Sequence, residues 1–95
     1  MIRREGDRLV LEGAVTIEEV PGLLPQGLAL LSQGETRIDL AGVTTADSSA
    51  VALLLEWLRV AERGGDRIVY LNLDNSLRSL ADLYGVTELL PVVPA

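Results

Sequence analysis

Short runs of apolar residues, bounded by glycine and polar turn residues, predict several β-strands in this chain. Residues 8–12 form the first run, and we expect them to pair with residues 1–5 through a turn at Gly6-Asp7. Residues 36–40 and 67–71 form two further runs of the same kind. The pattern therefore predicts a sheet built from these four segments.

Apolar residues that recur every three or four positions predict a helix after the first two strands. Thr16 and Glu19 match a capping box at its start, and Gly34 ends it. Pro21 and Pro25 interrupt the pattern. Because proline lacks a backbone N–H, the regular helix is expected to begin near Pro21. The predicted apolar face consists of Ile17, Val20, Leu24, Leu28 and Leu31.

Two further helices alternate with the strands. One runs from about Ser49 to Arg63, and the other is marked by Leu77, Leu80, Ala81 and Tyr84. Residues 87–91 are expected to form one last short turn. This alternation is typical of an α/β fold, so we expect a small mixed β-sheet with the helices packed mainly on one face. Residues 1–95 are expected to form a single domain, since the length suits one domain.

The helix at 49–63 is apolar over an arc of about 220°, when successive side chains are placed about 100° apart. Only Glu56, Arg59 and Arg63 form a clear polar face. A surface helix usually needs an apolar stripe of little more than about 100°. The surplus around Trp57 has two interpretations. Either the helix is buried in a small core, or Trp57 contributes to a surface for another protein.

Charge and composition exclude several classes of function. The net charge is -6, so the basic patch that a nucleic-acid-binding protein needs is not expected. The chain contains neither His nor Cys, which excludes structural zinc sites, cysteine nucleophiles and a Ser-His-Asp triad. The longest apolar run, residues 50–55, is far shorter than the about 18 residues of a membrane-spanning helix. We therefore expect a soluble protein with no cofactor and no metal, and the lack of Cys suits the cytoplasm.

Asp47, Ser48 and Ser49 stand between the strand at 36–40 and the second helix, after a turn expected to begin at Gly42. All three are good N-cap residues, because a short side-chain oxygen can accept a free N–H of the first turn. The positive end of the helix dipole points at the same place. An accessible hydroxyl here suits phosphorylation or contact with an anionic group of a partner. Helix capping and a functional site are therefore the two interpretations of these side chains.

The order of elements, together with this corner, resembles the STAS domain family, named for sulfate transporters and anti-sigma factor antagonists. The resemblance covers nearly the whole chain and implies a STAS-like fold. Ser48 matches the functional position that follows the Asp in the family. Many members have Gly where this chain has Ala50. The residues that carry the resemblance are Ile38-Asp39-Leu40, Val43, Asp47-Ser48-Ser49, Leu53-Leu54-Leu55 and residues 67–71.

Two branches of the family fit the chain. In the MlaB-type branch, the domain is an accessory subunit that binds the ATPase of a phospholipid-transporting ABC transporter and so supports outer membrane lipid asymmetry. In anti-sigma factor antagonists, a partner kinase phosphorylates the residue that matches Ser48 and switches binding off. Residues 80–86, followed by Leu90-Pro91, are similar to the short MlaB-type ending. The resemblance therefore implies an MlaB-type subunit, with the antagonist as the alternative.

The resemblance implies a non-enzymatic protein in the cytoplasm, peripheral to the inner membrane through a transporter complex. Its expected partner is the ATPase subunit of the transporter, and the alternative partner is an anti-sigma factor kinase. No catalytic site is expected, because no base is available for Ser48 and the carboxylates are scattered. The residues expected to bind the partner, or to be phosphorylated, are Asp47, Ser48, Ser49, Ala50 and Trp57.

Overall fold

The computed structural model describes residues 1–93, which form a mixed sheet with the strand order β1-β2-β3-β4-β5. β1 and β2 form an antiparallel hairpin, and the remaining neighbours are parallel. This confirms the hairpin predicted through Gly6-Asp7. The elements in chain order are β1 (Ile2–Glu5), β2 (Arg8–Val15), α1 (Val20–Leu30), β3 (Glu35–Ala46), α2 (Ser48–Arg63), β4 (Arg67–Leu71), α3 (Asn75–Leu83), the 3-10 turn η1 (Thr87–Leu89) and β5 (Val92–Val93).

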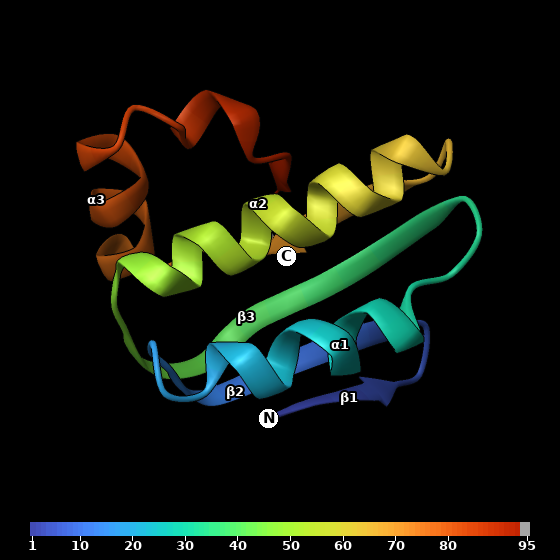
Figure 1. The fold of residues 1–95 in the computed structure, drawn as a ribbon, viewed down its shortest axis with the longest axis horizontal. Helices are drawn as coiled ribbons and strands as arrows, with labels where there is room; N and C mark the ends of the chain where they lie inside the picture. Colours follow the sequence, from blue (N-terminus) through green and yellow to red (C-terminus); the bar gives the residue numbers. More distant parts are fainter. Residues whose placement is uncertain (94–95) are drawn as a thin grey trace.

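The helices gather on one face of the sheet, as the sequence predicts for this α/β fold. α1 and α2 lie side by side across the sheet, and α3 packs beside the beginning of α2 (Figure 1). α2 therefore has the sheet beneath it, α1 on one side, and α3 on the other. This position requires the wide apolar arc of α2, because the helix is covered from three directions.

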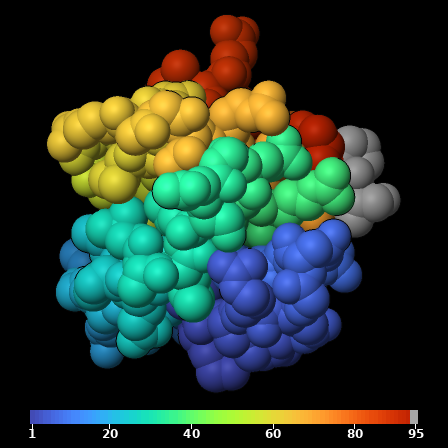
Figure 2. All heavy atoms as spheres, turned by 90° about the vertical axis from the view of Figure 1, so that its right-hand side faces the viewer, coloured from blue at the N-terminus to red at the C-terminus, as the bar shows by residue number. Residues whose placement is uncertain are grey.

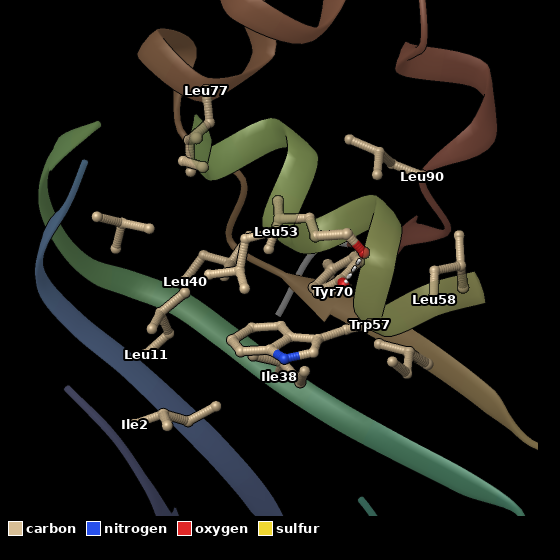
Figure 3. Packing of buried hydrophobic residues seen from close by; sticks show 14 of the residues in the cluster. Ile2, Leu11, Ile38, Leu40, Leu53, Trp57, Leu58, Tyr70, Leu77 and Leu90 are labelled. Atoms are coloured by element: carbon tan, nitrogen blue, oxygen red, sulfur yellow. Dashed lines mark hydrogen bonds between the residues drawn. The ribbon is translucent and has the colours of Figure 1, made fainter. Parts of the chain in front are cut away.

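The core lies between α2 and the sheet. Ile38 and Leu40 of β3 alternate with residues that face the other way, and both are buried. Two aromatic residues, Trp57 and Tyr70, are also fully buried among the aliphatic side chains (Figure 3). The Tyr70 hydroxyl donates a hydrogen bond to the carbonyl oxygen of Leu54 at 2.6 Å. Burial raises the pKa of Tyr70 well above its ordinary value, so this phenol stays neutral.

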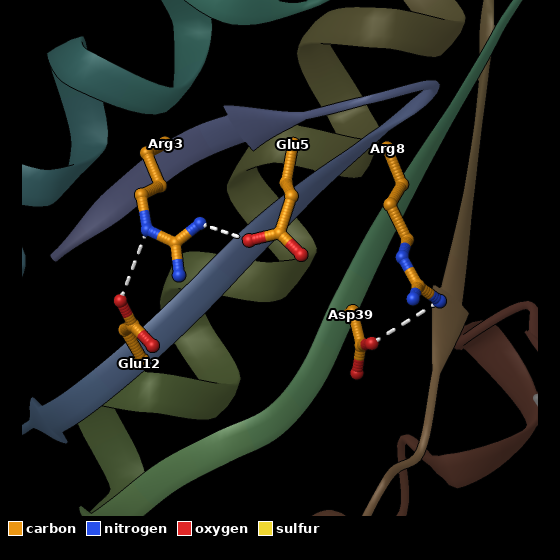
Figure 4. A network of polar contacts seen from close by, with 5 residues as sticks. All are labelled: Arg3, Glu5, Arg8, Glu12 and Asp39. Atoms are coloured by element: carbon orange, nitrogen blue, oxygen red, sulfur yellow. Dashed lines mark hydrogen bonds and ion pairs between the residues drawn. The ribbon is translucent and has the colours of Figure 1, made fainter.

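The opposite face of the sheet carries compensated charges. The Arg3 guanidinium bonds the carboxylates of Glu5 at 2.5 Å and Glu12 at 3.2 Å, and Arg8 lies 3.3 Å from Asp39 (Figure 4). Burial acts to raise the pKa of Asp39, but hydrogen bonds from Asn72 and the Ala41 N–H, with the charge of Arg8, outweigh it and lower the pKa. These groups satisfy one another, so this face is a solvated surface of the fold.

β3 is longer than the strand predicted at 36–40 and runs through Gly42 for 12 residues. The expected turn at Gly42 is therefore wrong. Val43, Thr45 and Ala46 continue to pair with β2, and a Cβ on Gly42 would lie 2.7 Å from the Cβ of Glu12. Glycine at this position permits close approach of two strands at a shift in their pairing register, and does not end the strand.

α1 begins at Val20, which confirms that the regular helix starts near Pro21. Its apolar face differs from the predicted one, because Thr16–Glu19 form a separate turn and Ile17 is exposed. The buried positions of the helix are Leu23 and Gly27, with Leu24 and Leu28 half-buried beside the core. The sequence also did not predict β5, because a strand of two residues carries no periodic signal.

Two loops meet at the end of the molecule away from the start of α2. The Gly34 N–H donates to the Asp66 carboxylate at 2.8 Å, and the Arg67 N–H donates to the Gly34 carbonyl at 2.7 Å. Figure 2 shows this end, with the loop before β3 (teal) between the end of α2 (yellow) and the β1–β2 hairpin (blue). These contacts hold β3 and β4 in register. The start of α2, at the other end of the molecule, is therefore attached to a sheet whose strands are fixed relative to one another.

Candidate functional site

Asp47 is the N-cap of α2, in extended backbone conformation between β3 and the helix. One oxygen of its carboxylate accepts the Ser49 N–H at 2.9 Å and the Ser49 hydroxyl. The hydrogen bond from the Ser49 hydroxyl has the largest effect on the pKa of the Asp47 carboxyl. Together with the N–H donors of Ile17, Ser49 and Ala50, it lowers the pKa of Asp47. Asp47 thus caps the helix with Ser49 as the donor, which is the capping role predicted for this corner as one of two interpretations.

The second carboxylate oxygen of Asp47 binds a turn that is distant from this corner in the sequence. It accepts the Ile17 N–H at 3.0 Å, across 30 residues of sequence. Within that turn the Glu19 carboxylate accepts the Thr16 hydroxyl at 2.5 Å and the Thr16 N–H at 2.9 Å. Both of these hydrogen bonds lower the pKa of Glu19, and the one from the Thr16 hydroxyl has the larger effect. The turn is therefore held firmly, and it presents the Ile17 side chain, 71% exposed, beside the start of α2.

Ser48 is the first residue of α2, and its side chain is exposed. The prediction that it lies at this helix terminus and is accessible is confirmed. Within residues 1–93, no hydrogen bond involves its hydroxyl, because Asp47 and Ser49 satisfy the first turn between them. The Ser48 hydroxyl can therefore contact another molecule without breaking a hydrogen bond of the helix cap.

An apolar groove begins at Ser48 and lies between α2 and the end of α3. It has a volume of about 260 Å³. Its wall on the α3 side is Tyr84, which is 55% exposed. A free hydroxyl beside an open apolar hollow is the arrangement of a protein contact, in which apolar burial supplies affinity and polar groups fix orientation. The groove is lined by Ser48, Val51, Ala52, Leu55, Tyr84 and Val86.

Two of the predicted site residues do not reach the surface. Trp57 is 0% exposed, and its indole N–H donates to the Leu24 carbonyl of α1 at 3.0 Å. The expectation that Trp57 contributes to a partner surface is therefore wrong, and its burial between α1 and the sheet explains the apolar arc. Ala50 is 2% exposed, because the first turn of α2 directs it into the core. Its methyl group consequently offers no contact to a partner.

The corner lacks the geometry of a catalytic site. Both oxygens of Asp47 already accept from Ser49 and Ile17, so this carboxylate is not positioned as a base for Ser48. Across the described part of the chain, no group of three or more acidic side chains lies close enough to hold a metal ion.

The apolar residues around Ser48 were not predicted from the sequence. The pattern used Tyr84 only to mark the third helix and placed Ile17 on the apolar face of the first, yet both side chains are exposed. One available signal was the position of Tyr84 directly before Gly85, since a residue at a helix end is covered on fewer sides. The other was Pro21, which separates Ile17 from the regular helix.

Comparisons with known proteins agree with this fold. A family model described as "Mlab, STAS domain" matches residues 1–92. The unphosphorylated form of the anti-sigma factor antagonist SpoIIAA is similar over 100% of this chain and 86% of its own, with 17% identity and a TM-score of 0.74. A putative anti-sigma factor antagonist from Thermotoga maritima gives 11% identity and a TM-score of 0.79, over 100% of this chain and 85% of its own. Among curated proteins, none matches the sequence. At these identities the two structures establish the fold alone.

Proposed function

The chain belongs to the MlaB-type STAS domain family, and we propose that it is a non-enzymatic subunit that binds the ATPase of a bacterial phospholipid-transport ABC transporter. The observation that carries this proposal is the free Ser48 hydroxyl at the start of α2, beside an apolar groove. The fold fixes the position of Ser48, and the side chains of its neighbours cap the helix in its place. Such a residue suits recognition by another protein.

The surroundings of Ser48 fit a protein partner. Ile17 and Tyr84 are large and exposed near Ser48, and aromatic side chains such as Tyr84 are enriched in the cores of interfaces. Glu18 is exposed next to Ile17, and the chain carries a net charge of -6. An acidic surface favours encounter with a basic one. We therefore expect the ATPase to present basic residues around an apolar centre.

In this proposal the protein stabilises the ATPase or sets its activity, and it catalyses nothing itself. It acts in the cytoplasm, at the inner membrane, through the transporter complex. Within residues 1–93, no helix is long and apolar enough to cross a membrane. The attachment to the membrane therefore depends on the partner in this proposal.

A second candidate function is that of an anti-sigma factor antagonist. The similarity to SpoIIAA and to the Thermotoga maritima protein favours it. In that case an anti-sigma factor kinase would phosphorylate Ser48. The new charge would stand beside Asp47, whose pKa is lowered and whose carboxylate already interacts with that of Glu19. Repulsion at the corner would then release the partner.

Co-purification separates the two functions. The tagged protein is isolated from the cells that make it, and its partners are identified by mass spectrometry before and after addition of ATP. The transporter function requires a stable complex with the ATPase subunit and an unmodified Ser48 in that complex. Recovery of a serine kinase, with a phosphate gained on Ser48 when ATP is added, would establish the antagonist function instead. A Ser48→Ala variant serves as the control for the phosphorylated position.

A further inference from the structure

The groove at Ser48 continues along α2 toward its end. Ser48, Ala52, Leu55, Arg59 and Glu62 are spaced by four and three residues in turn, so they form one stripe along the helix. A second hollow of about 200 Å³ lies on this stripe, lined by Leu55, Leu58, Arg59, Glu62 and Leu89. Both hollows share Leu55. The two hollows therefore adjoin at Leu55, and the groove that they form together follows α2 for about 21 Å, at 1.5 Å of rise per residue.

η1 supplies the wall of this second part. Leu89 of η1 is 61% exposed, although it stands directly beside the groove. Together with Tyr84, it gives the groove two large side chains that are more than half exposed. Exposed apolar side chains gathered beside a hollow and rimmed by polar residues are typical of an interaction site.

The charges beside the groove are mainly acidic. Arg59 is compensated within the chain, because its guanidinium bonds the Glu56 carboxylate, with Nε at 3.0 Å. Glu62 lines the groove and Glu88 adjoins Leu89, and both are exposed. Neither forms an ion pair among the described residues. The neighbouring Arg63 lies about 100° further around the helix from Glu62, toward Glu56. An occupant of the groove therefore meets apolar side chains flanked by free carboxylates.

We propose that this groove binds one amphipathic α-helix of the partner, with its apolar side on Leu55 and Leu89 and its Lys or Arg residues toward Glu62 and Glu88. The groove offers side chains and no free strand edge, so an extended segment would gain no backbone hydrogen bonds there. A helix laid in an apolar groove needs none. The proposal rests on the function proposed above. It adds that the segment contributed by the ATPase is helical, that it carries basic residues, and that it contacts this chain along α2.

Photocrosslinking tests the occupant. A photoreactive p-benzoylphenylalanine replaces Leu89 in one variant, Ala52 in a second, and Arg37 on the opposite face of the sheet in a third. All three positions are exposed, so the fold is expected to tolerate each change. After irradiation in the cells that make the protein, the crosslinked peptide is identified by mass spectrometry. We expect both groove variants to join a segment of the ATPase in which apolar residues recur every three or four positions with Lys or Arg beside them. The Arg37 variant should give no adduct.

Charge reversal gives an independent measurement. The double variant Glu62→Lys with Glu88→Lys should bind the purified ATPase at least tenfold more weakly, whereas Asp7→Lys in the β1–β2 turn should bind as wild type does. Crosslinking through Ala52 but not Leu89, an adduct with an acidic segment, or unchanged affinity of the double variant would overturn the helix proposal and leave the proposed function standing. Absence of any complex with the ATPase would overturn both.

Discussion

Gly27 of α1 lies directly against the indole of Trp57 in α2, so that a Cβ on Gly27 would fall 2.3 Å from Cζ2 of Trp57. The indole N–H, on the same side, donates to the Leu24 carbonyl at 3.0 Å. The two helices can approach this closely only because position 27 has no side chain. This contact fixes the orientation of α2, and with it the side on which Ser48 and the groove are presented.

We therefore predict that Gly27→Ala destabilises the protein. Alanine normally favours a helix over glycine, but here the added methyl group must displace a fully buried indole, and overpacking of this kind costs about 1–3 kcal/mol. The matched control is Gly22→Ala in the same helix, where a Cβ meets nothing within 4 Å. That change should stabilise the fold by up to about 1 kcal/mol. Urea denaturation of both variants measures the difference, and equal midpoints would contradict the contact.

Leu54, one turn before Trp57 on the same face of α2, provides a second test of the core. It is 1% exposed, and Leu58, one turn later, is 6% exposed, which confirms that both are core residues. Leu54→Ala is expected to lower the free energy of unfolding by about 2–5 kcal/mol, because the cavity cannot close completely. Leu83→Ala removes the same atoms from a side chain that is 75% exposed, and should change stability by less than about 0.5 kcal/mol. Similar losses in the two variants would show that burial does not govern the effect.

The order of elements could be predicted because each one carries a local signal. The β1–β2 hairpin has its turn at Gly6-Asp7, and the start and end of α2 are marked by Asp47 and Gly64. The sequence could not show which faces of the elements are buried by neighbouring elements. The apolar arc of α2 is equally consistent with a buried helix and with an exposed apolar strip, and only the position of α1 shows that Trp57 is inside.

The same limit applies to the site. The sequence placed Asp47, Ser48 and Ser49 at a helix start, and this is confirmed. It could not show which of them does the capping, because all three residue types can accept the same N–H. The bond from Ile17 to Asp47 spans 30 residues, and no local pattern predicts a contact over that distance. Only the fold separates the structural role of Asp47 from the free hydroxyl of Ser48.

Asp47 gives a prediction about pH. Its pKa is lower in the folded protein than the about 3.9 of an unfolded Asp. Its ionisation therefore adds stability above that unfolded value, and this contribution is lost as the pH falls through the lower folded pKa. Asp47→Asn should thus be less stable than wild type above the unfolded value of about 3.9, and the gap in denaturant midpoint should narrow as the pH falls below it. The exposed Asp7→Asn is the control. A gap that stays constant with pH would show that the charge of Asp47 is not involved.

Ser48→Asp should separate folding from binding. The fold should survive, because Asp47 and Ser49 keep the capping bonds and a carboxylate in the first turn suits the helix dipole. Binding to the ATPase should weaken at least tenfold, since a new charge enters an apolar contact next to Asp47. Circular dichroism melting and titration calorimetry measure the two effects. Gln26→Glu, which adds one charge at an exposed position of α1, should change neither. Wild-type affinity in Ser48→Asp would exclude the corner from the interface, and a lost melting transition would mean that Ser48 serves the fold.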